Sequence, residues 1–493
     1  MRTRVVLAMG IAALLLTAGC TYEAGLPADN ETATTTGSGS GTGSEAPTMA
    51  VGDGTDVRPD PPTDRIGWEN SVWYDDELPI TEADGLNDSE LRLVVDRAMA
   101  RVERVRDLEF ERNVSVEVIT REQYRERNVF DFRDDPFENQ VYEALFLVDE
   151  DTSAATAFES LYGGSVAGYY YDGQIVIVGD NSTAVTVDRG TLAHELTHAL
   201  QDQQLGSTGP GRTTDQRAAY QALPEGEANY VLDRYEERCA SEWACIAPVN
   251  STSSGQYNRG LFLTLFLPYS DGPDLVGELV ERGEDWTAVN DAWSDPPAST
   301  EQVIHPEKYP DEEPTVVDLP DRSDGEWEVV SSRGRAADTV GEAGVFAMLW
   351  ANGVVPEESL FDDADRYNYS HPASAGWGGD TVRAYERDGD YAYVWRTVWD
   401  TERDAREFRD AYRELLASKG AVERGDGRYR IEDGNFADAF RVQWTGDTVT
   451  IVNAPTVADL DDVYERGGAR AGVPTPLTRE GSESSDGRPA LAP

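Results

Sequence analysis

The segment His194-Glu195-Leu196-Thr197-His198 constrains this chain most, because it places two of only four histidines four residues apart. At 3.6 residues per helical turn, residues four apart lie on one face, so both imidazoles can reach a single ion. Glu195 lies about 100° around the helix from His194, where it can contact a water on the metal without binding the metal. The pattern predicts a zinc-binding helix with a general base. The competing interpretation is a solvated helix with incidental histidines.

A zinc site of this type needs a third protein ligand. Residues 217–240 have the apolar spacing of a second amphipathic helix, with the sequence Glu-Gly-Glu-Ala near its start at 225–228. The segment LAHELTHALQD resembles the active-site helix of the thermolysin family, including Asp202 eight residues after the first histidine. Glu-Gly-x-Ala resembles the third-ligand segment of the membrane-aminopeptidase branch. Both families belong to the gluzincin superfamily of zinc metallopeptidases.

The resemblance implies that one Zn²⁺ ion is held by His194, His198 and Glu225, and that Glu195 is the general base. The sequence departs from the family in its longer spacing between His198 and Glu225. It also lacks the thermolysin residues that flank the third ligand, since Pro224 precedes Glu225 and Asn229 lies four residues after it. Glu227 therefore stays open as an alternative metal ligand, and Asp202 as a ligand or an outer contact of the site.

Two further segments bear on catalysis. AGYYYDGQIVIVGD, just before the motif, has the β-branched and aromatic content of strand, with a turn at 172–173. By resemblance it forms the edge above the zinc that pairs with extended peptide, although an ordinary edge strand is an equal alternative.

His305 ends a short helix capped by Ser299 or Thr300. Gluzincins use a histidine or tyrosine to hydrogen-bond the oxyanion, which His305 could do; alternatively it packs under Tyr309.

The N-terminus predicts export and anchoring. Residues 1–20 combine two arginines, a short apolar core and small residues before Cys20, as in a lipoprotein signal peptide whose cysteine carries lipid. Residues 21–62 and 474–493 have almost no large apolar groups, which predicts a disordered stalk and tail. Cys239 and Cys245 are expected to form a disulfide outside the cytoplasm. These features indicate a protein anchored by lipid at the outer face of the cytoplasmic membrane.

The charge of the chain indicates its solvent. The net charge is −51, and Lys308 and Lys419 are the only lysines. An acidic, lysine-poor surface is typical of proteins from halophiles, and we expect an archaeal one here. So negative a field disfavours nucleic acid as a partner. A disordered acidic chain is excluded by a hydrophobic content of 39% and eleven tryptophans.

The fold class expected is α+β in two domains. Residues 63–311 form a gluzincin-like domain, in which a small sheet places an edge strand over a zinc-binding helix pair. Residues 312–473 form a C-terminal α+β domain with an antiparallel sheet, from strands at 381–385 and 391–399, a helix at 401–418 and a hairpin at 440–452. Helices are also expected at 87–107 and 141–149, strands at 108–110 and 114–120, and a turn at 376–380.

The function predicted is a cell-surface zinc peptidase that hydrolyses peptide or protein substrates with a metal-activated water. The alternative is a non-catalytic binding or cell-envelope lipoprotein on a peptidase-like scaffold. Hydrolysis of a non-peptide amide or ester is a third, weaker interpretation. The intact Glu195 favours an enzyme, because a binding module has no use for a base beside the metal. The sequence leaves the oligomeric state open.

Overall fold

The computed structural model describes residues 60–466, apart from 62, 81–83, 128, 130–131, 172, 180–184, 249–256 and 362–366. The predicted signal peptide with Cys20, the stalk up to residue 59 and the tail from residue 474 lie outside the described residues. Within the described part of the chain, no helix combines the length and the apolar character needed to cross a bilayer.

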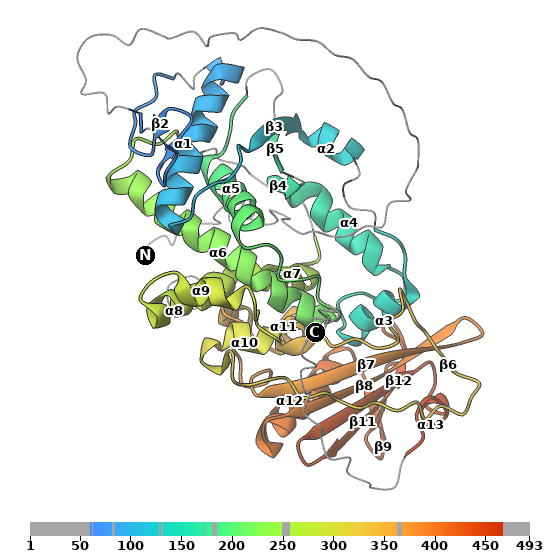
Figure 1. The fold of residues 1–493 in the computed structure, drawn as a ribbon. Helices are drawn as coiled ribbons and strands as arrows, with labels where there is room; N and C mark the ends of the chain where they lie inside the picture. Colours follow the sequence, from blue (N-terminus) through green and yellow to red (C-terminus); the bar gives the residue numbers. More distant parts are fainter. Residues whose placement is uncertain are drawn as a thin grey trace, which may run out of the picture.

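The fold is mixed α and β, with thirteen α-helices among the described residues (Figure 1). Their bounds are α1 Asp88–Arg106, α2 Arg121–Arg127, α3 Pro136–Ala144, α4 Ala154–Ser165, α5 Arg189–Gln204, α6 Thr214–Ser241, α7 Arg259–Ser270, α8 Gly272–Gly283, α9 Thr287–Ala292, α10 Thr300–Ile304, α11 Gly341–Ala351, α12 Glu402–Ser418 and α13 Asp459–Val463.

The strands form three sheets. Their bounds are β1 Trp68–Glu69, β2 Val72–Trp73, β3 Ser115–Thr120, β4 Gly168–Tyr171, β5 Gln174–Gly179, β6 Glu328–Val329, β7 Trp377–Arg387, β8 Asp390–Trp399, β9 Val422–Gly425, β10 Arg428–Arg430, β11 Ala439–Thr445 and β12 Thr448–Ala454. β1 and β2 form a hairpin, and a three-stranded sheet has the order β3-β5-β4. The largest sheet has seven strands in the order β6-β7-β8-β12-β11-β10-β9.

The small sheet lies beside the motif helix. β3 runs parallel to β5, whereas β4 pairs with β5 antiparallel and forms one edge of the sheet. β4 packs so closely on α5 that a Cβ added to Gly168 would meet Thr191 Cγ2 at 2.8 Å. The chain therefore brings an edge strand against the N-terminal half of the motif helix.

The seven-stranded sheet is antiparallel throughout and buries both faces. The amphipathic helix α12 packs Phe408 and Tyr412 against Trp395 of β8. On the other face, Leu460 and Val463 of α13 belong to a separate buried cluster. This arrangement confirms the predicted α+β unit with a helix over an antiparallel sheet.

Helix α11 joins the two predicted domains. Every residue from Gly341 to Trp350 is buried, and the helix contacts α6, α7 and α10 as well as β7 and α12. One hydrophobic core accordingly continues from the helices around α6 and α7 to the seven-stranded sheet. The boundary near residue 312 thus marks a change of secondary structure but no gap in the packing.

Local sequence signals predict the ends of some helices and strands well and those of others poorly. Asn87 forms the capping box that starts α1, and the antiparallel pair β4 and β5 matches the predicted strand segment. Residue 172 of the predicted turn lies outside the described residues. Residues 108–110 form no strand, however, since the backbone N–H of Phe110 is bound by Glu103. The helix expected at 141–149 ends at Ala144. The glycine-rich segment at 376–380, expected as a turn before a strand, is a turn only up to Gly376, and β7 begins at Trp377 with a register shift before Gly379.

Lys308 connects the helical part of the molecule to the start of α12. Its Nζ lies 2.6 Å from Glu301 of α10, 2.7 Å from Glu312 and 2.9 Å from Asp400. Glu301 is buried, so without the lysine its charge would have no close compensation. The ammonium therefore stabilises a contact between two parts of the chain that are far apart in sequence.

We predict that Lys308→Met lowers the free energy of unfolding by about 2–4 kcal/mol, because it removes the partner of a buried carboxylate. The matched control is Lys419→Met. Lys419 is the second lysine and lies over the Phe436 ring at 5.0 Å. Thermal melting in multimolar KCl should show a large fall in melting temperature for Lys308→Met and a small one for Lys419→Met. Equal melting temperatures would contradict the role assigned to Lys308.

Candidate metal centre

Helix α5 carries the histidine motif into the interior. The side chain of Asp188 caps its first turn and accepts hydrogen bonds from the N–H and the Oγ1 of Thr191, at 2.9 and 3.0 Å. His194 and His198, one and two turns further along the helix, are buried. Their rings meet edge to face, with the ring centroids 4.7 Å apart. The predicted helical spacing thus brings both imidazoles to one side of α5.

The two histidines meet a single glutamate, Glu225 of α6. The Nε2 atoms of His194 and His198 are 3.0 Å apart, and each lies 3.2 Å from Oε2 of Glu225. All three residues are buried, and their atoms could hold one metal ion. At metal–ligand distances of 2.0–2.1 Å, two ligands of a tetrahedral zinc ion lie about 3.3 Å apart. The triangle formed by Nε2 of His194, Nε2 of His198 and Oε2 of Glu225 is close to that size.

Neighbouring amides orient both imidazole rings. Nδ1 of His198 lies 2.8 Å from Oε1 of Gln201, and Nδ1 of His194 lies 3.0 Å from Oδ1 of Asn229. Gln201 Nε2 donates to the carbonyl of Pro224 and Asn229 Nδ2 to that of Tyr269, which fixes each amide with its oxygen toward the ring. The Nδ1 atoms therefore donate, and both Nε2 atoms face Glu225. Metal-binding histidines are commonly held this way.

A close approach of two helices positions Glu225. A Cβ added to Gly226 would lie 2.3 Å from the carbonyl carbon of Gly272, at the start of α8, so only glycine fits there. This contact explains the glycine of the Glu-Gly-x-Ala segment, which the sequence alone presented only as a resemblance. The backbone of α6 is thereby held against α8 next to the ligand.

Pro224 lies inside α6, although proline lacks the N–H of a helical hydrogen bond. The carbonyl four residues earlier, that of Tyr220, instead accepts a hydrogen bond from Oγ1 of Thr208 at 3.1 Å. Pro224 itself provides the carbonyl that fixes Gln201. The proline that departs from the family pattern therefore takes part in orienting His198.

Glu195 lies beside the triangle without joining it. Both of its carboxylate oxygens are buried, and among the described residues neither accepts a hydrogen bond of normal geometry. A buried carboxylate without a partner is costly in a structural role, which requires satisfied polar groups. The arrangement is instead suited to a group that exchanges a proton with a bound molecule.

The charges of the site are strongly coupled. Burial raises the pKa of Glu195 to about 8; His198 and the backbone of Tyr170 on β4 lower it, whereas Glu225 raises it. Burial also raises the pKa of Glu225, but the two histidines outweigh it and lower this pKa to about 2. Glu225 in turn raises the pKa of His198 to about 9, against the effect of burial. The site thus sets an anion, Glu225, beside two imidazoles, and this is the donor set that a divalent cation needs once it displaces the proton of His198.

The remaining candidate residues lie elsewhere. Glu227, the alternative third ligand, binds Arg106 Nε at 2.6 Å and Trp293 Nε1 at 2.8 Å, so both of its oxygens are engaged. Asp202 is largely exposed and accepts a hydrogen bond from Tyr170 Oη at 2.8 Å, which ties β4 to the end of α5. Nε2 of His305 lies 3.2 Å from Oε1 of Glu342 on α11. Its proposed contact with the oxyanion remains a prediction.

The other predicted features near α6 are structural. Cys239, near the end of α6, forms a disulfide with Cys245.

Asn229 and Gln201 contact the two histidines of the site, but the sequence did not single them out. Asn229 had a signal, because it stands four residues after Glu225, where the thermolysin pattern has an aspartate. Gln201 lies three residues after His198 on α5 and had no signal of its own.

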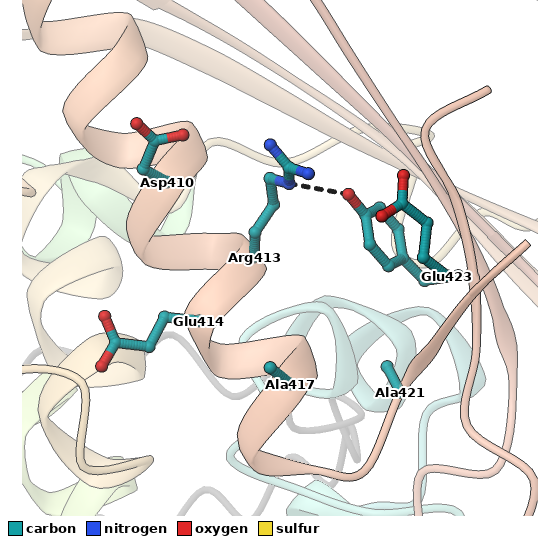
Figure 2. Close-up of a pocket in the computed structure, with 7 residues that line it drawn as sticks. Asp410, Arg413, Glu414, Ala417, Ala421 and Glu423 are labelled. Atoms are coloured by element: carbon teal, nitrogen blue, oxygen red, sulfur yellow. Dashed lines mark hydrogen bonds between the residues drawn. The ribbon is translucent and has the colours of Figure 1, made fainter. Parts of the chain in front are cut away.

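A surface hollow of about 440 Å³ lies between α12 and β9 (Figure 2). Arg413 crosses it and donates to Oη of Tyr429 at 2.7 Å, while Glu414 and Glu423 add negative charge. No histidine and no residue of α5 or α6 lines it. This hollow is therefore separate from the chemistry of the triangle.

Comparison with known proteins reaches only the C-terminal part. Residues 328–464 match a family described as a domain of unknown function, DUF8575. No curated protein and no solved structure matches the chain. The matched region contains α11 and the seven-stranded sheet, but neither α5 nor α6.

We predict that Gly226→Ala destabilises the protein by about 1–3 kcal/mol and loosens metal binding, because the added methyl group overlaps the backbone of Gly272. Gly277→Ala on α8 is the matched control, since its Cβ would have its nearest contact at 3.5 Å. It should be neutral or stabilising by up to about 1 kcal/mol. Thermal melting and metal titration measure both effects. A Gly226→Ala variant that melts like the control would contradict the close-approach argument.

Proposed function

We propose that the protein is a zinc-dependent peptidase of the gluzincin type, anchored by lipid on the outer surface of a halophilic cell. The observation that carries the proposal is the pairing of two groups. Three buried atoms that could bind a metal lie within 3.2 Å of one another, and beside them is a buried glutamate whose oxygens accept no hydrogen bond of normal geometry from the described residues. A binding protein would need the first group but not the second.

The residues of the triangle fit zinc by their chemistry. Two neutral imidazoles and one carboxylate form a common ligand set of catalytic zinc, which leaves a fourth position open. When bound, zinc lowers the pKa of a water molecule and polarises a carbonyl group. Asn229 and Gln201 hold the imidazoles in the tautomer that binds a metal.

Glu195 is the proposed general base. Its carboxylate takes a proton from the attacking water and later gives that proton to the leaving amine. A cation held by His194, His198 and Glu225 would lower the pKa of Glu195, because an opposite charge nearby favours the carboxylate. A bound cation would thus favour the ionised form of Glu195 that catalysis requires.

Strand β4 is the proposed site for extended peptide. Among the described strands it pairs with β5 alone, which leaves its other edge able to accept a further strand. Its backbone at Tyr170 is close enough to Glu195 to lower the pKa of that carboxyl. A peptide added to this edge would run past the base and the triangle, as the resemblance to gluzincins implies.

The location and solvent rest on the sequence. The basic, apolar and small residues that lead to Cys20 support a lipid anchor, and the polar segment after it supports a stalk. A net charge of −51 supports a protein that works in concentrated salt, where ions screen its acidic surface.

Substitutions separate the ligands from the base. Glu195→Gln keeps the shape of the side chain but removes the base, so the protein should retain about one zinc ion per chain while peptide hydrolysis falls about 100-fold or more. Glu225→Ala should lose both zinc and hydrolysis, because it removes the anionic ligand. Zinc content by mass spectrometry and peptide cleavage in multimolar KCl measure the two properties.

Glu227→Gln is the matched control, since Glu227 is two residues from Glu225 but faces Arg106. It should keep zinc. Loss of zinc in Glu227→Gln but not in Glu225→Ala would overturn the ligand assignment. Zinc binding without any hydrolysis in the wild-type protein would favour the binding-protein alternative, and unchanged hydrolysis in Glu195→Gln would exclude the proposed mechanism.

A further inference from the structure

A second cluster of carboxylates lies where α3 meets the seven-stranded sheet. Glu143 of α3, Glu150 shortly after it and Asp438 just before β11 each offer an oxygen, and these three oxygens lie within 4.8 Å of one another. Glu143 and Asp438 are buried, whereas Glu150 is exposed. Residues almost 300 positions apart thus bring three acidic groups to one point.

No basic side chain neutralises this cluster. Among the described residues, none of the three carboxylates has an arginine or lysine within ion-pair distance. Arg430 is the nearby cation, but its guanidinium is hydrogen-bonded to the carbonyl of Pro455 and lies 3.9 Å from Glu432. Burial, with Asp438 and Glu150, raises the pKa of Glu143 to about 8. Arg430 lowers the pKa of Glu150 and of Asp438, but burial still leaves the pKa of Asp438 raised to about 6. Among the described residues the cluster therefore has no direct cationic partner.

Two buried amides complete the cluster. Gln140 donates through Nε2 to Glu143, and Asn453 of β12 donates through Nδ2 to Asp438 at 2.8 Å. Their oxygens, Gln140 Oε1 and Asn453 Oδ1, are buried and have no hydrogen-bond partner in the described part of the chain. The two residues are only 5% and 1% exposed, so water does not readily satisfy these oxygens. An amide oxygen is a good ligand for a hard cation.

We propose that Gln140, Glu143, Glu150, Asp438 and Asn453 form a binding site for a divalent cation of the calcium type. The donors are all oxygens, from three carboxylates and two amides, which is the ligand chemistry of Ca²⁺. The absence of imidazole or thiolate in this set disfavours zinc. Rotation of either amide about its last bond would turn its oxygen toward the carboxylates once a cation lies between them.

A third acidic cluster provides the contrast. Glu301, Glu312 and Asp400 also come within 4.8 Å of one another, but Lys308 Nζ contacts all three. The fold supplies its own cation there and not at Glu143. The proposed ion would thus connect α3 to β11 and β12, as Lys308 connects α10 to the start of α12.

The test uses the full-length protein in multimolar KCl, first loaded with zinc and then freed of excess metal. CaCl2 at about 1 mM should raise the melting temperature by several degrees, because a ligand that binds only the folded state stabilises it. One calcium ion per chain should remain after gel filtration in the same salt. No rise and no retained calcium in the wild-type protein would overturn the proposal.

Variants identify the site. Glu150→Gln changes an exposed residue and should fold normally, yet weaken calcium binding about tenfold or more, because it removes one anionic ligand. Asp438→Asn should have at least as large an effect. The matched control is Glu414→Gln, an exposed glutamate of α12 that lines the hollow of Figure 2 and belongs to none of the acidic clusters among the described residues. Equal weakening in all three variants would indicate attraction to the acidic surface alone and contradict the proposal. An unchanged affinity in Glu150→Gln and Asp438→Asn would do so as well.

Discussion

The packing of α5 against α6 is the contact on which the candidate site depends. Two imidazole nitrogens and a carboxylate oxygen lie within 3.2 Å of one another only because two buried helices hold them there. Without a cation or a proton between them, such atoms repel one another. The close approach of Gly226 to Gly272 holds α6 from the side of α8, and the carbonyl of Pro224 accepts a hydrogen bond from Gln201 of α5. Other elements support these helices: β4 lies against α5, and α8 against α6.

Much of the molecule could be predicted where a signal is local. The capping box at Asn87, the spacing of Phe408 and Tyr412 on α12 and the i, i+4 histidines each act within one or two turns of helix. The hairpin of β11 and β12 could be predicted from its alternation and its turn for the same reason. The histidine pair on α5 is the part of the site that follows from sequence spacing alone.

The rest depends on contacts between distant segments. Helix α11 is apolar around its whole circumference, so it has no periodicity to detect and is recognised only once α7 and β7 cover it. The sequence could not choose between Glu225 and Glu227, because the choice depends on Arg106, more than one hundred residues away, which binds Glu227. In the sequence, Asn229 is only a departure from a family pattern, because its role depends on the hydrogen bond between its amide and His194 on another helix.

The most direct measurement is anomalous diffraction from crystals of the zinc-loaded protein, recorded on both sides of the zinc absorption edge. The account predicts one strong zinc peak about 2 Å from Nε2 of His194, Nε2 of His198 and a carboxylate oxygen of Glu225, with Glu195 near but not bound. A zinc peak at other residues, or no peak in the triangle at saturating zinc, would contradict it.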